Sequence, residues 1–253
     1  MRPIDKGLPT DDDGNIITQT DYKNWRRLLI DKIGYYCVYC NMPLSHSLQV
    51  EHVVPKNPPA GYIIGDPLAW DNMLLACGPC NNAKDNRPID AQTYYLPEQH
   101  NTHLPFSIVE SPNNNDHAIV VVANNLNLNQ IDKSNRTIRL LNLDNIDERN
   151  AIVDLRSKKR RKAMIAVNIA RDTFERLQAS PTYDANKAAQ DIAVRADASG
   201  FFSLWYHAFA DEPLVMQYLV NGDIIKGTAT NCFDPANNYE PTPRNPLNAA
   251  DPI

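Results

Sequence analysis

Two cysteine pairs with the spacing C-x-x-C carry the clearest chemical signal in this chain. Cys37 and Cys40 form one pair, and Cys77 and Cys80 form the other. Each pair can supply one knuckle of a tetrahedral thiolate site for Zn²⁺, and a site with four protein ligands is structural rather than catalytic. Two unrelated pairs of buried cysteines are the alternative. Redox catalysis is disfavoured because no thioredoxin-like βαβ pattern surrounds either pair.

A second group of polar residues lies between and just after the cysteine pairs. Glu51 and His52 occur in the run LQVEHVV, which predicts a short strand with these two side chains on opposite faces. A second strand is expected near residues 73–76, followed by a helical turn. Zinc would tie the start of this unit to its final helix, and would thereby fix Asn81 relative to His52 without a large core.

The ordered pattern of these residues resembles a known family of nucleases. C-x-x-C, E-H-x-x-P and N-x-x-x-x-C-x-x-C-N-x-x-K follow one another over residues 35–90. This pattern closely resembles HNH endonucleases of the ββα-metal type, which implies hydrolysis of DNA phosphodiester bonds. The resemblance implies these roles: His52 as general base, Glu51 and Asn81 as ligands of one divalent cation, Asn72 as the framework asparagine, and Lys84 as a cation near the phosphate.

The chain departs from the family pattern at its third letter, where Asn81 replaces histidine. An amide oxygen together with the Glu51 carboxylate favours Mg²⁺ or Mn²⁺ over Zn²⁺ at the catalytic position. Two protein ligands predict weak metal binding until a substrate phosphate joins. A lone histidine is most often structural, but the spacing around His52 favours catalysis. The rival hypothesis is a non-catalytic zinc-knuckle module that binds nucleic acid or a protein partner.

The remaining sequence predicts the elements that position this unit. A helix is expected from residue 20 or 21 to Gly34, and a hairpin over residues 105–123. Further helices are expected at 137–143, 149–177, 184–196 and from 203 onward. The fold class is therefore α+β, a zinc-stapled ββα-metal domain followed by a mostly helical domain. The expected boundaries are an N-terminal arm at 1–19, the nuclease domain at 20–104, a C-terminal domain at 105–234 and a flexible tail at 235–253.

A basic run within the longest predicted helix is a candidate nucleic-acid contact. Its candidate residues are Lys158, Lys159, Arg160, Arg161 and Lys162. Cationic side chains on one helix can grip phosphates. The alternative is a solvated helix face or a seam to an acidic partner.

Net charge limits the range of functions. The formal net charge is −5, so attraction to DNA must come from local patches or a bound cation rather than from an overall basic surface. The sequence has no apolar run of about 18 residues and no apolar N-terminal segment, so we expect a cytoplasmic protein without membrane contact.

Residues 136–144, together with Glu148-Arg149 and the basic helix after them, resemble a second group of proteins more loosely. This group comprises HNH subunits of bacterial anti-phage systems of the Septu kind, which accompany an ATPase. The likeness implies a role as the nuclease of a defence system, with an ATPase or another defence protein as partner.

Overall fold

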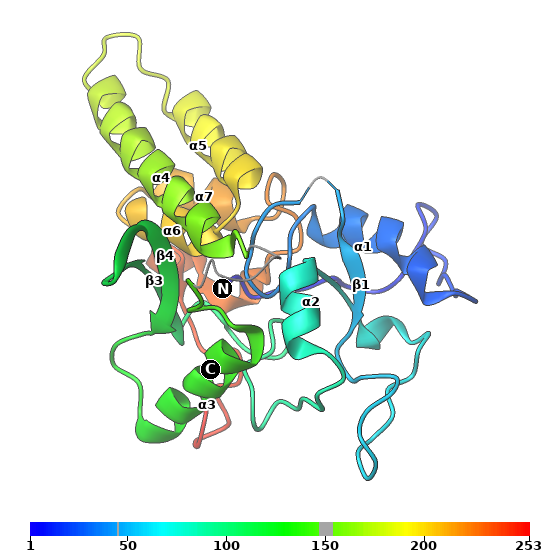
Figure 1. The fold of residues 1–253 in the computed structure, drawn as a ribbon. Helices are drawn as coiled ribbons and strands as arrows, with labels where there is room; N and C mark the ends of the chain where they lie inside the picture. The colour runs from blue at the N-terminus through cyan, green and yellow to red at the C-terminus, as the bar shows by residue number, and fades with distance from the viewer. Residues whose placement is uncertain (45, 147–153) are drawn as a thin grey trace.

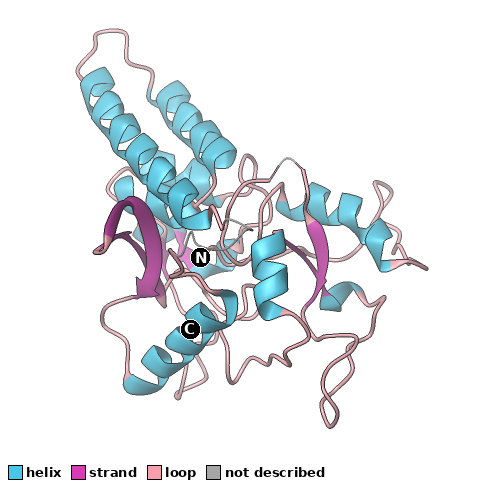
Figure 2. Ribbon diagram, in the orientation of Figure 1, coloured by secondary structure: helices cyan, strands magenta, loops and turns pink. Residues whose placement is uncertain are grey.

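A computed structural model describes residues 1–44, 46–146 and 154–253 (Figures 1 and 2). The helices are α1 (Trp25–Ile33), α2 (Gly78–Lys84), α3 (Leu128–Leu141), α4 (Arg156–Gln178), α5 (Ala185–Ser199), α6 (Phe202–Ala208) and α7 (Pro213–Val220). The strands are β1 (Gln49–His52), β2 (Met73–Ala76), β3 (Phe106–Ser111), β4 (Asn114–Val122), β5 (Phe233–Asp234) and β6 (Glu240–Pro241). The chain also forms the 3-10 turns η1 (Tyr22–Asn24), η2 (Trp70–Asn72), η3 (Thr230–Cys232) and η4 (Pro235–Asn237). The mixed α+β class expected from the sequence is confirmed.

The N-terminal unit consists of two short antiparallel strands followed at once by a helix. β1 pairs with β2 so that His52 faces Met73 and Gln49 faces Ala76. α2 begins directly after β2, because the Cys77 sulfur accepts the backbone N–H of Cys80 and a proline lies in the first turn. This ββα arrangement agrees with the strands and the helical turn predicted from the sequence.

The other helices and strands are of the type that the sequence predicts, but some of them begin at other residues than expected. The hairpin β3–β4 and the helices α5 and α6 form where they are expected. α3 begins nine residues before the predicted helix, at a capping box made by Asn127 and Gln130. The predicted helix at 149–177 starts in residues outside the described part of the chain, and its described portion is α4. The region from residue 203 onward, where one further helix is expected, contains both α6 and α7.

Both ends of the chain are packed against the body of the protein. Ile4 is fully buried and pairs with Thr228, and Arg2 donates to the Ile33 carbonyl. At the other end, Ile253 is buried and Asp251 forms an ion pair with Lys133. These contacts hold both ends of the chain, whereas the composition of residues 1–19 and 235–253 predicts an extended arm and a loosely held tail.

The buried apolar residues form two clusters. The first contains residues of α1, β1, β2 and α2, together with Phe106, Val120 and Ile138 from β3, β4 and α3. The second is built from α4 to α7 and the segment through Phe233. The hairpin and α3 thus pack with the ββα unit, although the sequence groups them with the C-terminal helices. No described helix is long and apolar enough to span a membrane.

Candidate active site and metal centres

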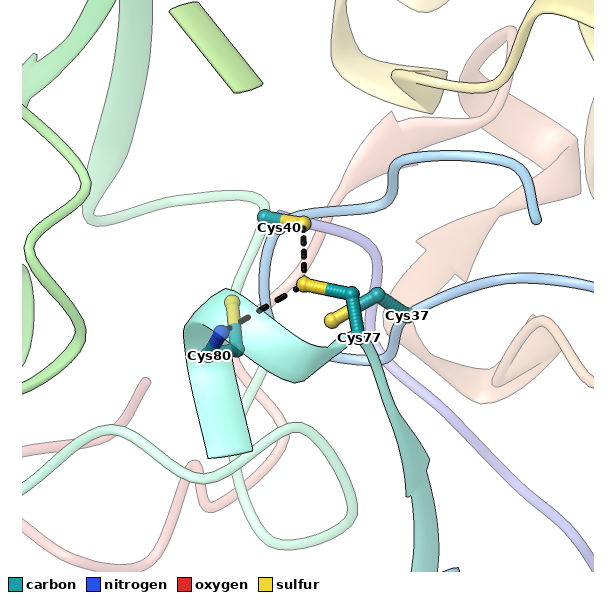
Figure 3. Close-up of side chains that lie close together, drawn as sticks. All are labelled: Cys37, Cys40, Cys77 and Cys80. Carbon is teal, nitrogen blue, oxygen red and sulfur yellow. Dashed lines mark hydrogen bonds between the residues drawn. The ribbon is translucent and has the colours of Figure 1, made fainter. Parts of the chain in front are cut away.

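The four cysteines of the two C-x-x-C pairs converge on one buried point. All four sulfurs lie within 4.8 Å of one another, and Cys40 Sγ is 3.8 Å from Cys77 Sγ (Figure 3). The first pair comes from the loop before β1, whereas Cys77 follows β2 directly and Cys80 lies on α2. Burial raises the pKa of Cys37, but hydrogen bonds from the other three cysteines outweigh burial and lower it well below the usual value. Four convergent thiols without a disulfide fit a structural Zn²⁺.

A small pocket of about 230 Å³ lies at the junction of β1 and α2. Its wall includes Glu51 and His52 from β1 and Asn81 and Lys84 from α2. Four residues that the sequence singles out for chemistry therefore meet at one cavity.

His52 occupies the pocket with one ring nitrogen engaged. Its Nε2 lies 3.3 Å from the carbonyl oxygen of Pro67, and its ring packs against Tyr22 with centroids 4.8 Å apart. A carbonyl can only accept, so this contact requires a proton on Nε2 and leaves Nδ1 as the free lone pair of the neutral ring. Burial, and to a smaller extent the charges of Lys56 and Lys84, lowers the pKa of His52, although the Pro67 contact opposes this shift.

Glu51 is buried and held by two partners. The Tyr39 hydroxyl donates to Oε1 at 2.9 Å, and the Lys84 ammonium contacts the same oxygen at 2.9 Å. Oε2 has no hydrogen bond from any residue in the described ranges. Burial raises the pKa of Glu51, and Lys84 and Tyr39 counteract that rise.

Lys84 does not point a free ammonium toward solvent. Its side chain is 2% exposed, and its Nζ also donates to the His52 carbonyl at 2.7 Å. The sequence predicts a cation available to a phosphate, but the structure shows a cation that fixes β1 and the Glu51 carboxylate. Burial against these two acceptors is the physical reason for the difference.

Asn81 and Asn72 complete the site in different ways. Asn81 Nδ2 donates to the Gln49 side chain at 2.7 Å, which turns the amide so that its Oδ1 is the atom available to a cation. Asn72 braces the loop between the two strands. Its amide donates to the carbonyls of Val54 and Asp66 and accepts the Val54 N–H at 2.7 Å.

Comparison with known families gives a match over the same part of the chain. Residues 37–87 match the family model described as HNH endonuclease, a span that contains both cysteine pairs and every residue of the site named above except Tyr22. This segment is an HNH endonuclease domain. No curated protein and no solved structure matches the chain. The match supports metal-dependent nuclease activity in general terms.

The basic run lies outside the HNH domain and only part of it is exposed. Lys159 and Lys162 face solvent, and Lys158 is half-buried. Arg161 pairs with Glu110, whereas Arg160 is 1% exposed and donates to the Ala118 carbonyl at 2.7 Å. The prediction that Arg160 contacts nucleic acid is wrong, because its position on α4 faces the protein interior.

Some residues around the HNH site escape prediction from the sequence. Tyr39 lies inside the first C-x-x-C, and its place beside a metal knuckle is the one available signal. Pro67 acts through its backbone carbonyl, which leaves no trace in side-chain patterns. Arg156 reaches Cys80 from 76 positions away, a distance that no local pattern reports.

Proposed function

We propose that this protein is a metal-dependent endonuclease that hydrolyses DNA phosphodiester bonds, with His52 as general base. The observation that carries the proposal is the convergence of Glu51, His52 and Asn81 on one pocket within the HNH domain. A titratable base beside two oxygen donors is the set of groups that hydrolysis of a phosphodiester requires.

His52 has the features of a base that works at neutral pH. Its Nε2 contact to Pro67 leaves Nδ1 to accept a proton from water, and its lowered pKa keeps the ring neutral. Asn72 supports this arrangement indirectly. It holds the carbonyl of Asp66, the residue before Pro67, so the carbonyl that orients the imidazole has a fixed position.

Glu51 and Asn81 would hold the catalytic cation. A carboxylate oxygen and an amide oxygen at one pocket fit a hard ion such as Mg²⁺ or Mn²⁺. When bound, such an ion neutralises charge on the phosphate and on the departing oxygen. Lys84 keeps Glu51 oriented through Oε1, while Oε2 remains for the cation.

A plasmid-cleavage assay with metal control tests the proposal. Freshly purified protein should convert supercoiled plasmid to nicked or linear DNA in Mg²⁺ or Mn²⁺, should stop in excess EDTA, and should resume when Mg²⁺ is restored. A protein that binds the plasmid but never cuts it, under any of these metals, is the outcome that the non-catalytic zinc-knuckle alternative predicts.

The looser resemblance to HNH subunits that accompany an ATPase extends the proposal to a partner. We propose that the chain is the nuclease of a bacterial antiviral defence system and acts with an ATPase. Affinity purification of the tagged chain from its host tests this: an ATPase recovered in stoichiometric amount supports it, and recovery of the chain alone contradicts it.

A further inference from the structure

α4 begins with two buried arginines beside the cysteine cluster. Arg156 and Arg160 are 2% and 1% exposed, and their i,i+4 spacing places them on one face of the helix. Taking a guanidinium out of water is costly unless an anion or several acceptors compensate it. The partners of these two residues therefore indicate which charge is buried with them.

Arg156 bonds directly to one of the clustered cysteines. Its Nη1 lies 3.0 Å from Cys80 Sγ and 2.8 Å from the Leu141 carbonyl, and its Nη2 donates to the Asn142 carbonyl at 3.1 Å. Asp154 pairs with the same guanidinium at 2.6 Å. One edge of the guanidinium thus faces the Asp154 carboxylate, and the other faces the Cys80 sulfur.

Arg160 has a charge that no carboxylate pairs within the described residues. Its Nη1 donates to the Ala118 carbonyl, and its Nε is buried without a hydrogen-bond partner. Cys40 and Cys80 are near enough to interact electrostatically with it. If the cysteines were neutral thiols, Asp154 would be the remaining counter-charge that acts on this guanidinium, and Asp154 already pairs with Arg156. Four thiolates around Zn²⁺ instead carry two negative charges in total, so that together with Asp154 they offset the positive charges of both arginines.

We infer that Arg156 and Arg160 are the cationic partners of the zinc tetrathiolate, and that they couple zinc binding to the docking of α4. Arg156 acts through a hydrogen bond to the Cys80 sulfur, and Arg160 acts through its buried charge. The HNH match ends at residue 87, so the metal site of the domain is completed by a helix that lies well beyond it in the chain. The inference requires the structural zinc and is independent of the proposed nuclease activity.

Zinc affinity measured by competition with a chromophoric chelator tests this directly on the full chain. Arg156→Met and Arg160→Met keep an elongated side chain and remove the charge. Loss of a hydrogen-bonded partner around a metal ligand typically weakens metal binding about 10- to 100-fold, and we expect a loss of that order for Arg156→Met. Lys159→Met is the matched control, because it removes the same charge from the same helix at an exposed position. Its zinc affinity should equal that of wild type.

A second comparison separates this effect from simple loss of stability. Val167→Ala removes buried volume from α4 in the second core, away from the cysteines, and should lower stability without changing zinc affinity. Substitution of Co²⁺ adds a spectroscopic readout, since the thiolate-to-cobalt charge-transfer band responds to a hydrogen bond on sulfur. The band should shift in Arg156→Met and stay unchanged in Val167→Ala.

Two results would overturn the inference. One is an Arg156→Met protein with wild-type zinc affinity and an unchanged cobalt spectrum. If Arg156→Met does not fold, Arg156→Lys retains the charge but cannot reproduce the fork of donors. An Arg156→Lys protein that is indistinguishable from wild type in zinc affinity and in cobalt spectrum, together with an Arg160→Met protein of wild-type affinity, contradicts the coupling equally.

Discussion

At the scale of single residues, the pocket is a set of side chains each fixed by a neighbour. Pro67 selects the tautomer of His52, Lys84 and Tyr39 orient Glu51, and Gln49 turns the amide of Asn81. Each contact leaves one atom free, either a ring nitrogen or an oxygen. The chemistry proposed for the site depends on those free atoms.

The first prediction concerns pH. Only neutral His52 can accept a proton, so kcat/KM should be low in acid and should rise as pH increases through the pKa of the free enzyme. Because burial lowers that pKa below 6.5, the midpoint of the rise should lie below 6.5 and activity should be full at neutral pH. Initial rates measured across pH at fixed free metal check this. A midpoint clearly above 6.5 contradicts the assignment.

The second prediction concerns the metal ligand on α2. Asn81→Ala removes an oxygen donor from a half-buried position, so the Mg²⁺ or Mn²⁺ concentration for half-maximal cleavage should rise about 10- to 100-fold, with partial rescue at high metal. Asn82 lines the same pocket, and Asn82→Ala is the matched control. Equal metal titrations for the two variants would remove Asn81 from the site.

At the scale of elements, the loop between β1 and β2 connects Asn72, which braces the loop, to His52, the proposed general base. Gly65 lies so close to the chain before it that an added Cβ would be 2.0 Å from the Val54 carbonyl oxygen, so only glycine fits there. The Asn72 side chain holds the same part of the loop together with three hydrogen bonds to the backbone of Val54 and Asp66. The close packing at Gly65 and the hydrogen bonds of Asn72 thus fix the loop between β1 and β2 without a large core.

The third prediction concerns the hydrogen bonds of Asn72. Asn72→Ala removes three partly buried hydrogen bonds to the backbone of Val54 and Asp66, so the free energy of unfolding should fall by about 1–3 kcal/mol. Cleavage should fall as well, because the Pro67 carbonyl loses its support. Denaturant unfolding and plasmid cleavage measure the two effects. Wild-type values in both measurements would mean that Asn72 does not hold the loop.

Some elements of the fold can be predicted from the sequence, and others cannot. The C-x-x-C spacing predicts the zinc cluster, and the run LQVEHVV and residues 73–76 predict the two strands, because these are local patterns. The start of α3 escapes prediction because its first turns are polar, and the helix gains its buried face from residues such as Lys133 and Ser134, which periodicity does not mark as core. The burial of Arg160 also escapes prediction, because the environment of its side chain depends on contacts with residues far away in the sequence.

At the scale of the whole molecule, a chain of net charge −5 must bind DNA through a local surface. Of the basic residues in the first turns of α4, Lys159 and Lys162 are exposed, while Arg156 and Arg160 are buried. The start of α4 therefore has two basic faces with different surroundings. One faces solvent, and the other faces the cysteine cluster.

The fourth prediction tests the exposed face. Replacing Lys159 and Lys162 by Glu should weaken DNA binding and reduce the slope of log K against log salt by about 0.9 for each phosphate that the protein no longer neutralises. Lys187→Glu with Arg195→Glu, on α5, is the control for the change in net charge. Fluorescence anisotropy across salt concentrations measures both pairs. Equal weakening by the two pairs would show that only total charge matters.

The most direct test of the central claim is the single-turnover cleavage rate of His52→Ala at saturating metal. General-base catalysis contributes about 100- to 10,000-fold, so the rate should fall by at least that order while zinc content and DNA binding are retained. His46→Ala, at an exposed histidine outside the pocket, should cut as wild type does. A His52→Ala protein that is free of contaminating nuclease and cuts as fast as wild type would contradict the account.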